Sequence, residues 1–159
     1  MDFFLDASIM VRLILNAEDA DKAEDILSVI ESGESKAYCT VAVLEEVAFK
    51  LFIAKASEIL NTDKFFHIKR ALKMKGSLRA KCCKVILDLQ TYVDTLRRGG
   101  LRVVEIIYED WAESIKYMQE NGLFTSDALH LAVMHRHGLH TIASFDRDFR
   151  RVKGIDVIP

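Results

Sequence analysis

Two short apolar runs near opposite ends of the chain each lead directly into aspartates. Asp6 follows the run Phe3–Leu5, and Asp146 and Asp148 follow the run 141–144. Both runs are typical of strands buried on both faces in a parallel sheet, where ligands bind beyond the carboxyl ends of the strands. If the two strands are neighbours, aspartates about 140 residues apart in sequence meet at one edge. A cluster of carboxylates without a nearby cation is typical of a site for a divalent metal ion.

Two further acids belong to the same edge. Glu46 falls about two turns into a helix expected after a second strand, and Asp127 begins an apolar helix that is expected to be buried. Each acid also has a simpler explanation, as a first-turn, turn, cap or exposed helix residue, and only the combination favours a site. Gathered carboxylates raise one another's pKa unless a cation neutralises them. Oxygen ligands of this kind suit Mg²⁺ or Mn²⁺, and such a metal site favours hydrolysis of a phosphodiester.

The elements that must position these acids alternate between strand and helix. We expect strands over 2–6, 37–40, 101–106, 141–144 and 155–158, and helices over 8–15, 20–31, 62–75, 79–97, 108–121 and 127–137. A further helix starts after Thr40, which is expected to cap it, and Thr125-Ser126 are expected to cap the helix at 127. The alternation predicts a three-layer α/β/α fold with a central, mainly parallel sheet. We expect one domain over 1–159, with 62–98 forming an extended helical pair, as an arm or insertion.

Composition excludes several classes of protein. Half of the 159 residues are apolar and the single proline is Pro159, which favours long helices in a globular domain. No run reaches the roughly 18 to 20 apolar residues of a membrane span, and no secretory leader is visible. Three cysteines (Cys39, Cys82 and Cys83) form neither a disulfide framework nor a CxxC pair. We therefore expect a cytoplasmic protein with reduced cysteines and no membrane contact.

The net charge of −2 conceals a strong segregation of charge. Residues 61–98 carry 10 Lys/Arg and 3 Asp/Glu, a net of +7, whereas residues 1–60 carry a net of −7. A basic segment beside an acidic body suggests a polyanion partner, although a solvated basic helix face explains it equally well. The candidate nucleic-acid contacts in this segment are Lys69, Arg70, Lys73, Arg79 and Lys81.

Five motifs give the chain a family resemblance. They are Phe4–Ser8, Thr40–Val47, Ser126–Ala132, Ala143–Phe149 and Gly154–Ile158. In this order and spacing they resemble the PIN domain, a metal-dependent nuclease fold, and within it the single-domain toxins of the VapC type. The resemblance runs nearly from one end of the chain to the other.

The resemblance implies roles for individual residues. The catalytic acids would be Asp6, Glu46, Asp127 and Asp146, of which Asp6, Asp127 and Asp146 would hold Mg²⁺ or Mn²⁺, with Ser144 and Asp148 in support. Glu46 is preferred to Glu45 because it directly precedes Val47 and stands six residues after Thr40. Phe145 departs from the small polar residue that the family commonly has there. His130, one turn after Asp127, is expected to be a structural residue with a hydrogen bond.

The function that the resemblance implies is that of an endoribonuclease dependent on Mg²⁺ or Mn²⁺, acting as the toxin of a toxin–antitoxin pair. Its expected partners are an RNA substrate and an antitoxin-like protein, and the middle helices also suit a homodimer surface. The alternative is a catalytically silent PIN-like module that binds RNA or protein. For the nuclease, we expect Asn at position 6 or 146 to raise the stability of the metal-free protein.

Overall fold

A five-stranded parallel sheet forms the centre of the molecule, as seen in a computed structural model that describes all residues 1–159. The strands are β1 (Asp2–Leu5), β2 (Lys36–Thr40), β3 (Leu101–Val104), β4 (Thr141–Ala143) and β5 (Asp156–Ile158). Their order across the sheet is β3-β2-β1-β4-β5, and every neighbouring pair is parallel. The predicted fold class is confirmed, with a sheet that is wholly rather than mainly parallel.

The first strand lies at the middle of the sheet because its apolar residues are covered on both faces. Phe3, Phe4 and Leu5 are all buried. Phe4 pairs with Ile142 and Leu5 with Ala143, so the strands that precede the aspartates are neighbours, as the sequence predicts. The backbone N–H of Asp6 donates to the carbonyl of Ala143 at 3.0 Å, which extends this pairing by one residue. Asp6 and Ser144 therefore emerge side by side at the carboxyl edge.

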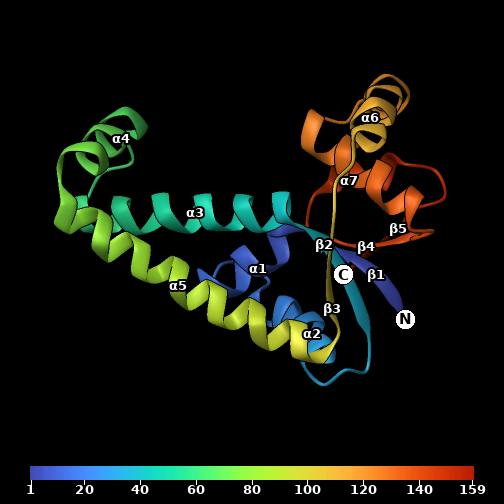
Figure 1. Cartoon of the computed structure of the whole chain (residues 1–159), viewed down its shortest axis with the longest axis horizontal. Helices are drawn as coiled ribbons and strands as arrows, with labels where there is room; N and C mark the ends of the chain where they lie inside the picture. Colours follow the sequence, from blue (N-terminus) through green and yellow to red (C-terminus); the bar gives the residue numbers. More distant parts are fainter.

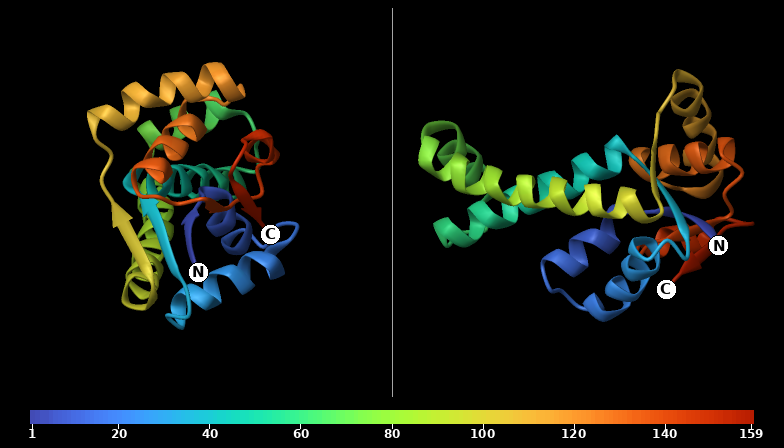
Figure 2. Two further views of the ribbon diagram at one scale, coloured as in Figure 1. Left: turned by 90° about the vertical axis from the view of Figure 1, so that its right-hand side faces the viewer. Right: turned by 60° about the horizontal axis from the view of Figure 1, so that its bottom comes forward.

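Seven α-helices surround the sheet. They are α1 (Ala7–Ile14), α2 (Ala20–Glu31), α3 (Val41–Leu60), α4 (Phe65–Met74), α5 (Gly76–Gly99), α6 (Tyr108–Asn121) and α7 (Thr125–Arg136). Figures 1 and 2 show α1, α2 and the ends of α3 and α5 on one side of the sheet, and α6 and α7 on the other. A short 3-10 helix, Arg147–Arg151, connects β4 to β5. None of the helices combines the length and the apolar character needed to cross a membrane.

The middle helices extend well away from the sheet, with α4 at their far end (Figure 1). The 20 residues of α3 span about 30 Å. A small separate core holds the far end together and comprises Ala56, Ile68, Ala71, Leu72, Leu78 and Cys82. The expected break at Gly76-Ser77 lies one residue too late, because the extended residue is Lys75 and α5 begins at Gly76. The carbonyls of Leu72 and Lys73 each accept a hydrogen bond from Arg79 Nη1 at 2.8 Å, which closes the end of α4.

Two glycines at the other end of α5 allow it to pack closely against the end of α2 and the segment that follows it. A Cβ on Gly99 would collide with the backbone carbonyls of Ile30 and Glu31 at the end of α2, and one on Gly100 would collide with the carbonyl of Ser35. Only glycine permits this close approach of backbone to backbone. The arm is thereby fixed to the sheet at the start of β3.

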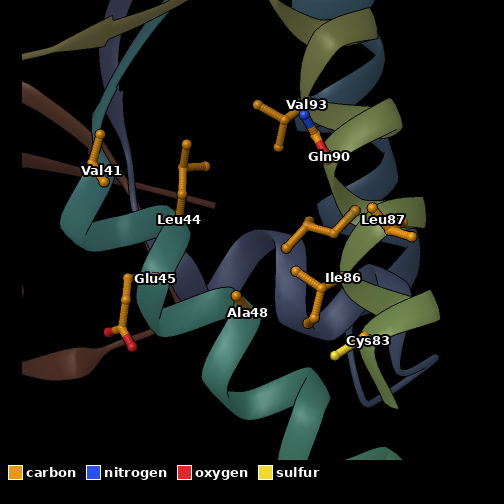
Figure 3. A pocket seen from close by; sticks show the side chains of 10 residues that line it. Val41, Leu44, Glu45, Ala48, Cys83, Ile86, Leu87, Gln90 and Val93 are labelled. Atoms are coloured by element: carbon orange, nitrogen blue, oxygen red, sulfur yellow. The ribbon is translucent and has the colours of Figure 1, made fainter. Parts of the chain in front are cut away.

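An apolar groove of about 550 Å³ runs between α3 and α5 (Figure 3). Its walls include Leu44 and Ala48 on α3 and Ile86 and Leu87 on α5, and the Glu45 carboxylate at its border points away from α5. Leu87 is 61% exposed, so a large apolar side chain meets solvent here. Exposed apolar surface of this kind is typical of sites that bind a protein, a membrane or a ligand.

Candidate active site at the carboxyl edge of the sheet

Asp6 is a buried carboxylate held by two serines, Ser8 in the first turn of α1 and Ser144 directly after β4. It occupies the N-cap of α1, a position where an aspartate accepts hydrogen bonds from free backbone N–H groups. Its Oδ2 accepts from Ser8 N at 3.2 Å, from Ser8 Oγ at 2.5 Å and from Ser144 Oγ at 2.8 Å. All three bonds fall on one oxygen. Oδ1 is left free to act as a ligand.

The same two serines shape the turn that follows β4. The backbone N–H of Phe145 donates to Ser8 Oγ at 3.0 Å, and that of Asp146 donates to Ser144 Oγ at 2.9 Å. Asp146 in turn caps the 3-10 helix, accepting from Asp148 N at 2.8 Å. Ser8 is a site residue that was not predicted from the sequence. Its signal was its position two residues after Asp6, since an Asp-x-Ser at a helix start allows this type of cap.

Phe145, at the position where the resemblance implies a small polar residue, packs its ring against Arg12. The guanidinium carbon of Arg12 lies 4.1 Å from the ring centroid, an attractive cation–π geometry. The substitution therefore leaves the hydrogen-bonded geometry around Ser144 and Asp146 in place.

Asp127 feels the charge of every other candidate acid. Burial and, after it, the negative charges of Asp146, Asp6, Glu46 and Asp148, in that order, together raise the pKa of this carboxyl to about 6. Asp127 lies in the first turn of α7, which begins at Thr125 with Phe124 in the N-cap position. The predicted side-chain cap by Thr125 or Ser126 is wrong, because no side chain caps this helix. The helix starts earlier than expected and carries its acid into the first turn instead.

Glu46 and Asp148 lie at the border of this group and each has a basic partner. Glu46 Oε1 accepts from Lys50 Nζ at 2.6 Å, and Asp148 Oδ1 pairs with Arg151 Nη2 at 2.8 Å. Glu46 is half-buried, and its charge reaches both Asp127 and His130. Glu45, the neighbour to which Glu46 was preferred, is exposed at the border of the apolar groove.

His130 packs beneath the site in an apolar environment. It is buried, and its ring centroid lies 5.4 Å from that of Phe4. Burial lowers the pKa of the imidazole. The negative charges of Asp6 and Glu46 act in the opposite direction and raise this pKa, but the effect of burial is larger. The expected structural hydrogen bond is wrong for Nδ1, which is buried without a partner. The expectation followed the general rule that buried polar atoms are paired, and this nitrogen is an exception.

The candidate acids differ in how well their arrangement and their chemistry fit a metal ion. No three or more His, Cys, Asp or Glu side chains stand together in an arrangement that could enclose an ion. The chemistry of these acids nevertheless fits a hard cation, because the charges of four other carboxylates add to burial in raising the pKa of Asp127. Oxygen-only ligands favour Mg²⁺ or Mn²⁺ over the softer metals that histidine and cysteine select.

The basic candidates lie elsewhere. Lys69, Arg70 and Lys73 are exposed on α4 and Lys81 is exposed early in α5, at the far end of the arm. Arg79 is engaged with the carbonyls at the end of α4. The structure thus separates an acidic edge on the sheet from a basic surface on the arm.

Comparisons with known proteins bear on the fold. The PIN domain family matches residues 3–155. No curated protein matches the chain. Three solved structures have a similar fold, and each covers 99% of this chain. A toxin–antitoxin complex from Klebsiella pneumoniae has a TM-score of 0.58 and 15% identity, with 96% of that chain covered. VapBC2 from Rickettsia felis bound to a DNA fragment from their promoter has a TM-score of 0.55 and 14% identity, with 97% of that chain covered. The sarcin–ricin loop cleaving toxin VapC20 from Mycobacterium tuberculosis has a TM-score of 0.58 and 16% identity, with 99% of that chain covered.

Proposed function

The chain belongs to the PIN domain family, and on that premise we propose that it is an endoribonuclease dependent on Mg²⁺ or Mn²⁺. One observation carries the proposal: the charges of Asp146, Asp6, Glu46 and Asp148 all act on Asp127 at the carboxyl edge of the sheet. Like charges gathered at one edge weaken the fold unless they serve a cation. The similarity to VapC20, a sarcin–ricin loop cleaving toxin, favours RNA as the substrate and the toxin of a toxin–antitoxin pair as the role.

Each side chain has a defined part in this proposal. Asp6, Asp127 and Asp146 would hold the metal ion, and Ser8 and Ser144 orient Asp6 by fixing its Oδ2. A divalent ion bound there would supply positive charge that stabilises the negative charge developing at phosphorus. Glu46 is the acid left to accept a proton from the attacking water, and the contact of Lys50 Nζ with its Oε1 at 2.6 Å orients it. Asp148 supports Asp146 from the adjoining 3-10 helix.

We further propose an antitoxin-like protein as the occupant of the apolar groove between α3 and α5 (Figure 3). One of the similar structures is a toxin–antitoxin complex. The groove has the apolar walls that the face of an amphipathic partner helix requires. A protein of this kind would act in the cytoplasm. If the groove is the contact, Leu87→Glu should weaken a complex with the product of a neighbouring small gene at least about tenfold in a pull-down titration.

Metal-dependent cleavage is the direct test of the enzyme. The purified protein is expected to cleave end-labelled single-stranded RNA in the presence of Mn²⁺ or Mg²⁺. This cleavage is expected to stop when a chelator is added in excess. Glu46→Gln should remove cleavage, and its neighbour Glu45→Gln, which alters an exposed acid outside the edge, should leave it unchanged.

Two results would contradict the proposal. Cleavage that continues in chelator, or equally in Glu46→Gln, points to a contaminant or a different site. An absence of both cleavage and a metal-induced rise in melting temperature at millimolar metal favours the silent binding module.

A further inference from the structure

Three phenylalanines are exposed where α3 meets α4. Phe49, Phe65 and Phe66 have 49%, 42% and 83% of their surface exposed. Their rings form a chain, with centroids 6.4 Å apart between Phe49 and Phe65 and 5.9 Å apart between Phe65 and Phe66. Large aromatic side chains that cluster in solvent mark a binding surface rather than a core.

Two of these rings belong to a groove of about 380 Å³, here called the arm groove. Phe49, Ile53 and Phe65 form its apolar part, and Lys69, Lys73 and Arg79 form its basic part. Phe66 does not line it. Phe65, Lys69 and Lys73 stand at positions i, i+4 and i+8 of α4, so an aromatic ring and two cations share one face of that helix. Aromatic rings beside cations suit a ligand that has both planar and anionic groups.

The cations of the arm groove lack acidic partners. Residues 64–87 contain eight Lys/Arg and no Asp/Glu. Lys69 and Lys73 are exposed and take part in none of the nine ion pairs of the molecule, although Arg79 is already bound to the carbonyls of α4. Unpaired cations attract phosphates, and exposed aromatic rings stack with unpaired bases. The apolar groove between α3 and α5 has no lysine or arginine in its lining, so the two grooves suit different partners.

The arm groove and the acidic edge share one face of α3. Glu46, Phe49 and Ile53 stand at positions i, i+3 and i+7 of α3 and therefore share one face of that helix. Phe49 lies about 4.5 Å and Ile53 about 10 Å along the helix axis from Glu46. An RNA segment held in the arm groove would therefore lie along the face of α3 that also carries Glu46.

We propose that the arm groove binds the single-stranded RNA segment that flanks the cleaved phosphodiester. Bases stack on Phe49 and Phe65, and phosphates pair with Lys69 and Lys73. The inference rests on the proposed nuclease function and adds to it the surface that positions an unpaired substrate. Both proposals can fail separately, because the groove acts in binding and the carboxylates act in cleavage.

Binding in the absence of cleavage is the first test. An unstructured fluorescent oligoribonucleotide is titrated in excess chelator and followed by anisotropy, with thermal melting as the check on folding. Phe65→Ala is expected to weaken binding about tenfold, since one stacked base is lost. Phe66→Ala removes a more exposed ring outside the groove and should change binding less than about twofold.

The lysines are tested by salt dependence. Joint replacement of Lys69 and Lys73 by Gln should lower the slope of log affinity against log salt by about 1.4, the value for two lost phosphate contacts on a single strand. Joint replacement of Lys116 and Lys153, which are exposed on the far side of the sheet, should leave the slope unchanged.

The effect of the arm groove on cleavage is a separate test. In cleavage supported by metal, Phe65→Ala should raise the KM for a long oligoribonucleotide and leave the KM for a dinucleotide unchanged.

The outcomes separate the two proposals. Binding that depends on Phe65 and the two lysines, without any cleavage, supports the arm groove and removes the nuclease proposal. Metal-dependent cleavage with binding unchanged in Phe65→Ala and in the lysine pair overturns the arm groove and leaves the nuclease. The arm-groove proposal is also overturned if the protein binds duplex RNA and single-stranded RNA with equal affinity. It is overturned as well if Phe65→Ala abolishes self-association in sedimentation and leaves RNA binding unchanged.

Discussion

Replacing Asp127 by asparagine is expected to lower RNA cleavage at least about 100-fold and, at the same time, to make the metal-free protein more stable at pH 7. Residues that merely support a metal ligand affect activity about 10- to 100-fold, and a ligand itself should matter more. The gain in stability follows from the raised pKa of about 6, which shows that the folded state disfavours the ionised carboxyl. Loss of activity with a gain in stability is the signature of a functional acid.

The gain must depend on pH in a defined direction. In the unfolded chain Asp127 has an ordinary pKa near 3.8, and in the folded protein its pKa is about 6. The wild-type protein is therefore penalised in full above pH 6, and the penalty disappears as the folded carboxyl takes up its proton below that pH. Two pKa units correspond to about 3 kcal/mol, which partial exposure reduces to roughly 1–2 kcal/mol. Asp127→Asn should melt roughly 3–5 °C higher at pH 7 and equal to wild type near pH 4.

Chelator-treated protein and differential scanning calorimetry across this pH range provide the measurement. Glu45→Gln is the matched control and should alter neither activity nor melting. A lower melting temperature of Asp127→Asn at pH 7 would mean that this carboxyl is a structural hydrogen-bonding group and would remove it from the site. Added Mn²⁺ should raise the melting temperature of the wild type more than that of the variant.

Asp6 requires a different expectation from the one drawn from sequence. The sequence indicated that Asn at position 6 would relieve repulsion and stabilise the metal-free protein. The structure shows Asp6 Oδ2 accepting three hydrogen bonds, two of them from serine hydroxyls. Charge-assisted bonds of this type weaken when an amide replaces the carboxylate. We therefore expect Asp6→Asn to lower stability, and Asp127 becomes the cleaner probe of repulsion.

The sequence predicted the sheet well because its strands carry unambiguous signals. Phe3, Phe4 and Leu5 form a continuous apolar run, and such runs suit only a strand buried on both faces. Parallel pairing then requires helical crossovers, and these are visible as amphipathic segments such as 20–31, which matches α2. Capping by Thr40 was also predictable, and its Oγ1 accepts from Val43 N at 3.4 Å.

Side-chain detail was less accessible. The choice of partner for each polar atom depends on contacts between residues far apart in sequence, such as Ser144 Oγ with Asp6 Oδ2, 138 residues away. The start of α7 was misplaced because Thr125 and Ser126 have good capping chemistry but lie inside the helix. The arm groove was missed for a similar reason. Phe49 and Phe65 belong to different helices, and only the packing of α4 on α3 brings their rings together.

Among the substitutions predicted here, replacement of Arg136 is expected to produce the largest drop in the free energy of unfolding. Its Nε donates to Asp110 Oδ1 at 2.7 Å and its Nη2 to Asp110 Oδ2 at 2.9 Å, a two-point contact with a buried carboxylate. Nη2 also donates to the carbonyl of Glu105 at 2.7 Å. Arg136 thereby ties the end of α7 to the start of α6 and to the segment after β3. Because α7 carries Asp127 at its other end, this contact also orients the candidate site.

Arg136→Met should lower the free energy of unfolding by about 2–3 kcal/mol at pH 7, because it leaves a buried carboxylate unpaired. In a chain of 159 residues this corresponds to a fall in melting temperature of about 5–10 °C. Arg136→Lys keeps the charge but cannot make the two-point contact, so it should retain only part of the stability. Arg97→Met is the matched control, since its partner Asp94 is 3.4 Å away and both side chains are largely exposed; it should cost less than about 0.5 kcal/mol.

The pH dependence distinguishes this contact from simple loss of packing. Burial raises the pKa of Asp110, but the hydrogen bonds from Arg136 and from the Ile107 N–H outweigh it and hold the pKa below its usual value. A depressed pKa contributes stability above the unfolded pKa of about 3.9, and that stability is lost as the pH falls through the folded pKa. The gap between wild type and Arg136→Met should therefore narrow as the solution is acidified, since the unpaired carboxyl of the variant can then be protonated. A gap of constant size from pH 7 down to pH 3 would show that Arg136 acts through its aliphatic packing alone, and the ion-pair account of how α7 is held would be wrong.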